Sequence, residues 1–163
     1  MNSNIPKTIF ITGATSGFGK ATAKLFNKNG WQTVITGRRA DRLEEIAKEL
    51  GEGCLPLSFD VSDRRSVKSA IENLPPNFNK ISVLCNNAGL ALGLEGADNA
   101  NLDDWDQMID TNIKGLVYAA TSISMGVLIN QNIGTLNNEK ELMDKYYNDY
   151  SNATNPDLIS SSW

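Results

Sequence analysis

The alternation of short apolar runs with amphipathic stretches constrains the fold of this chain more than any other feature. Runs rich in β-branched and apolar residues lie at residues 7–12, 31–36, 54–61 and 81–89. The first of them lacks strict polar alternation, which favours a strand covered on both faces. Apolar residues at helical spacing follow the runs, over residues 19–30, 41–50, 62–74 and 103–124. This pattern predicts an α/β fold, a doubly wound parallel sheet with right-handed crossovers and helices on both faces.

Residues that begin or end helices stand at the borders of these stretches. Gly30 and Gly51 follow the first two, where a helix C-terminus favours a left-handed residue. Asp41 and Ser62 precede the second and third helices and are predicted N-caps. In the long stretch 103–124, one stripe is apolar except for Asn112; its other members are Trp105, Met108, Ile109, Ile113, Leu116, Val117 and Ala120.

A glycine-rich segment, ITGATSGFGK at residues 11–20, joins the first predicted strand to the first helix. A nucleoside triphosphate P-loop is excluded because Lys20 is followed by alanine rather than by Ser or Thr. Gly13, Gly17 and Gly19 instead allow backbone N–H groups at a helix N-terminus to face a pyrophosphate without obstruction by Cβ atoms. The spacing predicts dinucleotide binding, and a plain tight turn is the alternative.

The position of this loop in the sheet supports the same interpretation. In doubly wound sheets, ligands bind beyond the carboxyl ends of the strands where the chain order reverses. That point is predicted between the first and fourth strands. The glycine loop and the segment NNAG, residues 86–89, both fall there.

Two arginines follow the second predicted strand, where an acidic side chain would bind the ribose hydroxyls of NAD. Arg38 and Arg39 favour the 2′-phosphate of NADP through charge-assisted hydrogen bonds of about 1.5–3 kcal/mol each. The cofactor predicted from this position is NADP. The alternative is that both arginines are solvated residues at the start of a helix. The missing carboxylate also argues against an S-adenosylmethionine methyltransferase.

Composition excludes several function classes. The net charge of −4 comes without a basic stripe, so neither nucleic acid nor an anionic membrane is an expected partner. The absence of histidine excludes a Ser-His-Asp triad and a His-ligated zinc site. Cys54 and Cys85 lie in apolar runs and are predicted core residues, and no metal site is expected. Because no signal or membrane-spanning segment is apparent, a cytoplasmic protein is predicted.

Four motifs in order resemble the short-chain dehydrogenases/reductases: TGATSGFG at residues 12–19, DV at residues 60–61, NNAG at residues 86–89 and DTNIKG at residues 110–115. Within that family, TGRR, NNAGLALG and DTNIKGLVYA resemble the NADP-dependent 3-hydroxy acid dehydrogenases that oxidise serine and allo-threonine. The resemblance covers about residues 5–120. It implies a Rossmann-type fold and hydride transfer between NADP and a small hydroxy acid or alcohol.

The resemblance also implies roles for particular residues. The phosphate-binding residues would be Gly13, Ala14, Thr15, Ser16, Gly17 and Phe18. Arg38 and Arg39 would hold the 2′-phosphate, Asp60 and Val61 would flank the adenine, and Asn87 would lie along the cofactor. Asn112 would be the catalytic candidate, a residue that kinks the long helix and orders a proton-relay water. Alternatives remain for three of these: Asp60 as a helix cap, NNAG as a turn, and Asn112 as a structural hydrogen-bonding residue.

The family's catalytic Ser and Tyr-x-x-x-Lys pair have no counterpart in this sequence. No lysine stands four positions after Tyr118, Tyr146, Tyr147 or Tyr150. The chain is therefore interpreted as a truncated N-terminal half, and its own activity is predicted to be weak or absent. A domain over residues 1–125 is expected, followed by a divergent polar tail over 126–163 with one helix at 138–150.

Three functions remain open at this point. The first is an NADP-dependent oxidoreductase of the family with low turnover. The second is a non-catalytic dinucleotide-binding or interaction protein, and the third is an inactive truncated fragment. Self-association is predicted through the long helix 103–124 or through an exposed strand edge.

Overall fold

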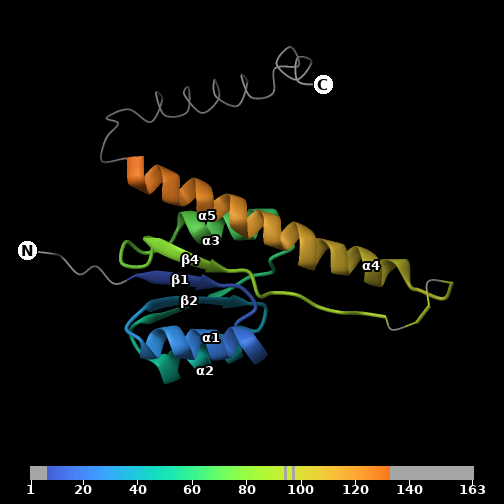
Figure 1. Cartoon of the computed structure of the whole chain (residues 1–163), viewed down its shortest axis with the longest axis horizontal. Helices are drawn as coiled ribbons and strands as arrows, with labels where there is room; N and C mark the ends of the chain where they lie inside the picture. Colours follow the sequence, from blue (N-terminus) through green and yellow to red (C-terminus); the bar gives the residue numbers. More distant parts are fainter. Residues whose placement is uncertain (1–6, 94, 97, 133–163) are drawn as a thin grey trace, which may run out of the picture. The chain divides into compact units, whose positions relative to one another are not determined.

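The computed structural model describes residues 7–93, 95–96 and 98–132. Its sheet has four parallel strands, β1 (Thr8–Ile11), β2 (Gln32–Gly37), β3 (Cys54–Ser58) and β4 (Ile81–Cys85), in the order β3-β2-β1-β4. The helices are α1 (Gly17–Lys28), α2 (Ala40–Leu50), α3 (Arg64–Glu72), α4 (Leu102–Ile109) and α5 (Gly115–Asn132), and a π-helical turn, η1 (Asp110–Lys114), joins the last two. The predicted doubly wound α/β fold is confirmed (Figure 1), and the chain order reverses between β1 and β4.

Helices cover both faces of the sheet, α1 and α2 on one side and α3 and α5 on the other (Figure 1). Ile9 of β1 packs in the first core with Leu43 of α2, whereas its neighbour Phe10 packs in the second core with Val67 of α3 and Ala119 of α5. Successive residues of a strand pack in different cores because their side chains point to opposite faces of the sheet. Each fully buried side chain of this size contributes about 1.5–3 kcal/mol to stability.

The two cysteines belong to the first core, as predicted. Cys54 is buried in it, and the partly buried Cys85 packs against it. Both are free thiols, and burial raises the pKa of each thiol above its ordinary value. Both therefore act as small apolar side chains at neutral pH.

Two predicted helix caps are wrong. Helix α2 begins at Ala40 with Arg39 at the N-cap, so Asp41 lies in the first turn. Helix α3 begins after Asp63, whose carboxylate accepts a hydrogen bond from the Arg65 amide at 3.0 Å. Ser62 lies one residue before this N-cap, and its N–H and hydroxyl both donate to Asp60 Oδ1, at 2.9 and 2.8 Å. Asp60 thus closes a turn before the helix and is not the helix cap.

The predicted C-terminal glycines are confirmed. Gly30 and Gly51 follow α1 and α2 with φ angles of +79° and +78°, a backbone region that disfavours other residues.

The long predicted helix is present, but it is interrupted and faces another way. It runs as α4, η1 and α5, and the π turn shifts the phase of the residues that follow it. The buried face of α5 consists of Gly115, Ala119 and Ile123, of which Ala119 and Ile123 belong to the second core. Most large members of the predicted apolar stripe are exposed instead: Trp105, Ile109, Ile113, Leu116 and Val117.

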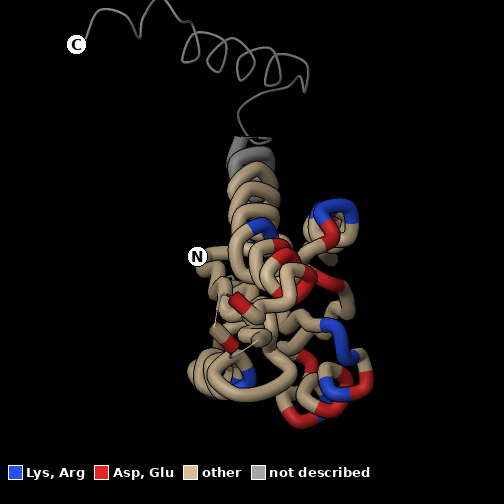
Figure 2. The backbone as a smooth tube through the Cα atoms, turned by 90° about the vertical axis from the view of Figure 1, so that its right-hand side faces the viewer, with Lys and Arg blue, Asp and Glu red and all other residues tan. Residues whose placement is uncertain are grey.

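The described helices carry charges of both signs. Asp110 and Lys114 form an ion pair of 2.6 Å within η1, and Lys24 of α1 pairs with Glu49 of α2. Figure 2 shows the same mixture, with Lys and Arg segments beside Asp and Glu segments along the tube. Among the described residues no helix is both long enough and apolar enough to cross a membrane.

The predicted domain boundary at residue 125 lies inside α5. Contacts within the chain divide it between Val127 and Leu128, and each part is a separate unit. The predicted helix at residues 138–150 lies outside the described residues. The domain organisation therefore stays a prediction.

Candidate functional site

A cavity of about 390 Å³ opens at the carboxyl ends of β1, β2 and β4. Nine of the residues predicted to bind a cofactor line it: Gly13, Thr15, Ser16, Phe18, Arg38, Arg39, Asp60, Val61 and Asn87. These residues come from four separate loops of the sequence. Their convergence on one cavity is the arrangement that the switch-point argument predicts.

Two glycines of the loop are required by close packing against the segment after β4. A Cβ atom on Gly13 would lie 2.7 Å from the Ala88 Cα, and one on Gly19 would lie 2.5 Å from Asn87 Nδ2. Gly17 differs, because it has a φ of +53° and nothing within 4 Å of a Cβ position. Gly13 and Gly19 therefore bring two segments together, whereas Gly17 leaves open space at the start of α1.

Thr12 and Asn87 fasten the glycine loop to β4. The Thr12 hydroxyl accepts hydrogen bonds from the Asn87 and Ala88 amides, each at 3.0 Å. Asn87 Nδ2 donates to the backbone oxygens of Thr12 and Gly13, at 3.1 and 2.9 Å. Since the Asn87 amide is used in this way, NNAG is more than a turn: it sets the position of the loop beside it.

Two predicted cofactor residues do not line the cavity. Ala14 is fully buried, and its amide donates to the Thr36 carbonyl at 2.9 Å, so this amide is already hydrogen-bonded. Gly17 is exposed as the first residue of α1. Ser16 precedes it at the N-cap without a capping side-chain hydrogen bond, which leaves N–H groups of the first turn free to face an anion.

The two arginines lie at the cavity in different settings. Arg39 Nη2 donates to the hydroxyls of Thr15 and Ser16 in the glycine loop, at 2.5 and 3.4 Å. Arg38 Nη1 lies 3.8 Å from Asp60 Oδ2; the Arg38 side chain is largely exposed, and that of Asp60 is partly exposed. Because an exposed ion pair at that distance contributes little to stability, Arg38 stays available to an anionic ligand.

Asn112 lies in η1 and holds the loop that follows NNAG. Its Oδ1 accepts from the Leu90 amide at 2.9 Å, and its Nδ2 donates to the Leu90 carbonyl at 2.8 Å. Leu90 lines the cavity, as does Thr111. Both polar atoms of the Asn112 side chain thus form structural hydrogen bonds, which was the alternative stated from the sequence. A catalytic role for Asn112 stays a prediction.

The sequence reasoning missed several residues that shape this cavity. Gly37, Phe59 and Thr111 line it, and a Cβ on Gly37 would lie 2.8 Å from the Thr15 Cγ2. Thr12 fastens the loops. Thr12 and Gly37 stand inside motifs that the sequence analysis quoted, so a signal existed. Thr111 also stands inside a quoted motif, DTNIKG, but the motif did not indicate that its side chain lines the cavity.

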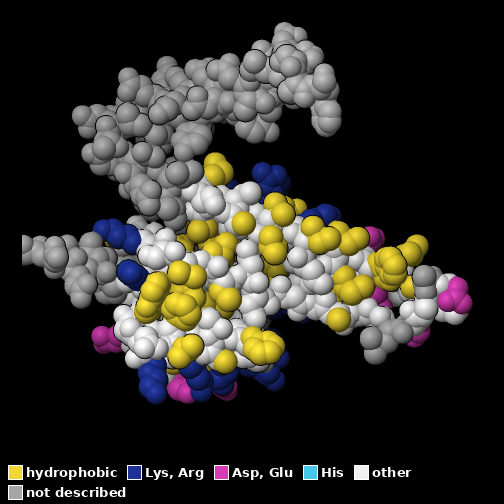
Figure 3. All heavy atoms as spheres, in the orientation of Figure 1, with side chains coloured by type: hydrophobic (Ala, Val, Ile, Leu, Met, Phe, Trp, Pro, Cys, Tyr) yellow, Lys and Arg dark blue, Asp and Glu magenta, His cyan; other side chains and the backbone are white. Residues whose placement is uncertain are grey.

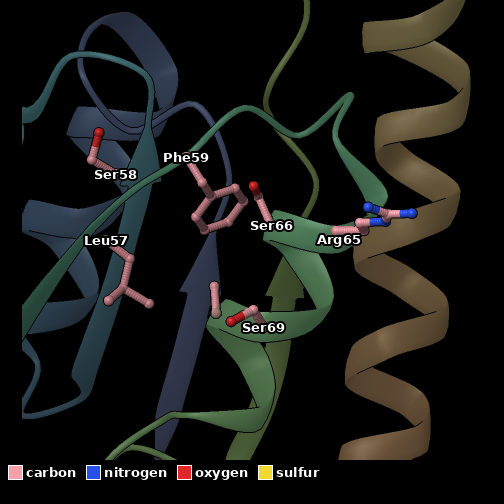
Figure 4. A pocket seen from close by; sticks show the side chains of 7 residues that line it. Leu57, Ser58, Phe59, Arg65, Ser66 and Ser69 are labelled. Atoms are coloured by element: carbon pink, nitrogen blue, oxygen red, sulfur yellow. The ribbon is translucent and has the colours of Figure 1, made fainter.

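A second cavity, of about 430 Å³, lies between β3 and α3. Figure 4 shows the Phe59 ring pointing toward Ser66 of α3, with Ser69 one turn further along. This cavity shares only Phe59 with the first one and contains none of the predicted cofactor residues. Within the described part of the chain, no group of three or more Cys, Asp or Glu side chains could hold a metal ion.

Comparisons with known proteins agree with this geometry. The sequence model of the short chain dehydrogenase family matches residues 7–136. A probable NADP-dependent dehydrogenase of Haemophilus influenzae is 46% identical over 139 residues, which are 85% of this chain and 55% of the relative. Serine 3-dehydrogenase of Rhizobium radiobacter is 53% identical over 110 residues, which are 68% of this chain and 44% of the relative.

A solved structure of serine dehydrogenase from Escherichia coli superposes with a TM-score of 0.72 at 41% identity, covering 77% of this chain and 57% of that one. A closed form of serine dehydrogenase with NADP⁺ gives a TM-score of 0.73, also at 41% identity, and covers 77% and 50%. The chain spans about half the length of the curated relatives it matches. With its parallel sheet, its glycine loop and a family match over residues 7–136, this chain belongs to the short-chain dehydrogenase family.

Proposed function

We propose that the chain binds NADP(H) in the cavity at the ends of β1, β2 and β4. The observation that carries this proposal is the convergence of Arg38 and Arg39 with the glycine loop on one cavity. Free N–H groups at the start of α1 suit the pyrophosphate of NADP. The two guanidinium groups suit its third phosphate, the 2′-phosphate. Relatives named NADP-dependent, and one solved with NADP⁺, support the same cofactor.

The reaction proposed is hydride transfer from a small hydroxy acid or alcohol to NADP⁺, or from NADPH to the corresponding carbonyl compound. NADP⁺, when bound, would accept the hydride; Asp60 and Val61 would hold its adenine end, and Asn87 would lie along its length. The relatives named serine 3-dehydrogenase and NADP-dependent 3-hydroxy acid dehydrogenase support this substrate class.

Turnover by the 163-residue chain is proposed to be low. General acid–base catalysis contributes about 10²–10⁴-fold to rates, and the sequence contains no Tyr-x-x-x-Lys pair to supply it. The specific observation that favours a non-catalytic alternative is the Asn112 side chain, since both of its polar atoms bond to Leu90. We also propose that the protein is cytoplasmic and that it associates with further copies of itself.

Binding is tested by titration of the full chain with NADPH and with NADH, followed by fluorescence and thermal unfolding. At 100 times its dissociation constant, NADPH stabilises the fold by about 2.7 kcal/mol, and NADH at equal concentration stabilises it less. The double variant R38A/R39A abolishes the difference. Arg42→Ala, on α2 but outside the cavity lining, is the matched control and retains it. Equal binding of both nucleotides by the wild type contradicts the assignment of NADP.

Activity is tested separately, with NADP⁺ and either L-serine or 3-hydroxypropionate, by absorbance of the reduced nicotinamide. Slow reduction of NADP⁺ that saturates with substrate concentration supports the proposal that the chain is an oxidoreductase. Tight NADPH binding without any reduction supports the non-catalytic alternative.

A further inference from the structure

The first residue of α5, Gly115, lies against the wall of the dinucleotide cavity. Gly115 is buried, and a Cβ atom there would lie 2.8 Å from Val61 Cγ2, 3.1 Å from its Cβ and 3.3 Å from its carbonyl oxygen. Cβ atoms do not approach other heavy atoms below about 3.0 Å, so the contact exists only because residue 115 has no side chain.

Val61 has little freedom to yield to a side chain at position 115. It is 6% exposed, and it is a short, β-branched residue with a stiff χ1 angle. On its N-terminal side, Asp60 is fixed by the Ser62 amide and hydroxyl, and both Asp60 and Val61 line the cavity. A displacement of Val61 therefore changes the cavity itself.

The other side of the contact also leads to the cavity. Gly115 directly follows η1, in which Thr111 lines the cavity and Asn112 holds Leu90, another lining residue. If η1 retreats from Val61, these residues retreat with it. Either movement alters the lining, because packed segments shift as units.

We propose that Gly115 is a positioning residue for nucleotide binding: it lets the start of α5 lie directly on Val61 and so fixes the width of the cavity at its Asp60–Val61 wall. The inference rests on the proposed function, since it assumes that NADP(H) occupies this cavity. Its specific consequence is that a single methyl group at position 115 weakens binding of the adenine half of the nucleotide without contacting the ligand.

The same helix provides a matched control at Gly126. A Cβ there would lie 3.5 Å from Ile71 Cγ2, which is an ordinary van der Waals contact. Replacement of glycine by alanine inside a helix favours the helix at both positions by a similar amount. The two variants therefore differ in what the added methyl group meets.

The test measures dissociation constants of the full chain for NADPH and for adenosine 2′,5′-bisphosphate, which carries only the adenine half. For G115A both constants rise by about 10-fold or more, the change that a 1.4 kcal/mol loss produces. For G126A both stay within about twofold. Unfolding by urea is recorded in parallel, because a purely structural role shifts the midpoint and leaves binding by the folded fraction unchanged.

A double-variant cycle with Val61→Ala makes the test independent of the folding of G115A. Removal of Val61 Cγ2 eliminates the closest contact and leaves those to the Cβ atom and the carbonyl oxygen, at 3.1 and 3.3 Å, so G115A weakens binding less in the V61A background than in the wild type. If the double variant is worse than V61A by the full effect of G115A, the inference is wrong. If the wild type binds NADPH but G115A binds equally well, the inference alone fails; if the wild type does not bind NADPH, the proposed function fails with it.

Discussion

At the scale of single residues, one hydroxyl group joins the two segments that form the cavity. Thr12 is 2% exposed, and its Oγ1 accepts from two successive amides after β4, Asn87 and Ala88. Successive N–H groups that meet one acceptor must both point the same way. The single oxygen atom therefore fixes the direction of the chain where it enters the cavity.

Substitution of Thr12 by valine is predicted to destabilise the fold by about 1 kcal/mol, because it leaves the partly buried Ala88 amide without its acceptor. The shape of the side chain is conserved, so packing changes little. Urea unfolding measures the effect. The outcome that contradicts the argument is a midpoint equal to that of the wild type.

Thr36→Val supplies the opposite case and serves as the control. Thr36 is fully buried in β2, and its Oγ1 has no hydrogen-bond partner among the described residues. Removal of an unsatisfied hydroxyl is predicted to be neutral or to stabilise the fold by about 1 kcal/mol. The same urea titration checks it, and a loss comparable with that of Thr12→Val would show that the hydroxyl is satisfied after all.

The two arginines are predicted to differ when they are replaced singly. Arg39→Ala removes the guanidinium that lies on the Thr15 and Ser16 hydroxyls and lowers the preference for NADPH over NADH by about 10- to 100-fold. Arg38→Ala also lowers it, but less, because the Asp60 carboxylate, 3.8 Å from Arg38, already offsets part of the positive charge that Arg38 offers to a phosphate. Both side chains are exposed, so melting temperatures of the free variants stay close to that of the wild type. A large fall in melting temperature would instead make the arginines structural.

Residue by residue, the sequence indicated which motifs meet but not how each member is used. The three glycines looked equivalent, yet Gly13 and Gly19 pack against the NNAG segment and Gly17 leaves space. Ala14 stands inside the motif and is buried. Such differences depend on contacts between segments more than 70 positions apart, which a local pattern does not contain.

At the scale of elements, the N-cap of α3 carries a charge that links its stability to pH. Hydrogen bonds from the Ser66 hydroxyl and the Arg65 amide lower the pKa of Asp63 below its ordinary value of 3.8. A carboxyl group whose pKa is lower in the folded state stabilises the fold above pH 3.8, and this contribution is lost as the pH falls through the folded value.

Asp63→Ala is therefore predicted to lower the urea midpoint at pH 7, and the difference from the wild type shrinks as the pH falls below about 4. Asp41→Ala, in the first turn of α2 but not at its N-cap, is the control and has a smaller effect. A difference between Asp63→Ala and the wild type that is constant from pH 7 to pH 3 would exclude the charge as its source.

The interrupted helix shows where element prediction from sequence stops. A regular period of 3.6 residues placed Trp105, Ile109 and Ile113 on one buried-looking stripe. The observed helix contains a π turn, and it buries Gly115 and Ala119, whose small side chains give a weak hydropathy signal. The existence and the start of the helix were predictable, whereas its end at Asn132 lies beyond the predicted end at residue 124, and the face that it buries depended on packing against α3 and Val61.

At the scale of the whole molecule, the helix leaves an apolar surface uncovered in the described part of the chain. Exposed apolar residues follow one another along α4, η1 and α5: Leu102, Trp105, Ile109, Ile113, Leu116, Val117 and Met125. In Figure 3, hydrophobic side chains gather along these elements on the face in view. Contiguous surfaces of this kind favour association.

The wild type is accordingly predicted to self-associate at micromolar concentrations, and the double variant I113K/L116K to weaken association by about 10-fold or more. Sedimentation velocity over a range of concentrations measures it. Leu25→Lys, which changes an exposed apolar residue on α1, is the control and leaves association unchanged. A wild type that stays monomeric throughout would show that this surface does not mediate contacts between copies.

The order of the strands was predictable because it follows from general rules of connection. Alternating strands and helices with right-handed crossovers leave few topologies, and the observed order β3-β2-β1-β4 is the one that puts the glycine loop beside NNAG. Helix caps were less predictable, because Asp60, Ser62 and Asp63 all stand before α3 and are capping residue types, and only Asp63 accepts from an amide of its first turn.

The bonds between Thr12 and Asn87 join positions 75 apart in the chain. The chain between these two positions must close into a loop before the hydrogen bonds can form. The cavity is therefore complete only after β4 has paired with β1. During synthesis, the whole glycine loop therefore leaves the ribosome before the nucleotide cavity is complete. A pyridine nucleotide bound as proposed would therefore stabilise the assembled sheet and would not guide the early steps of folding.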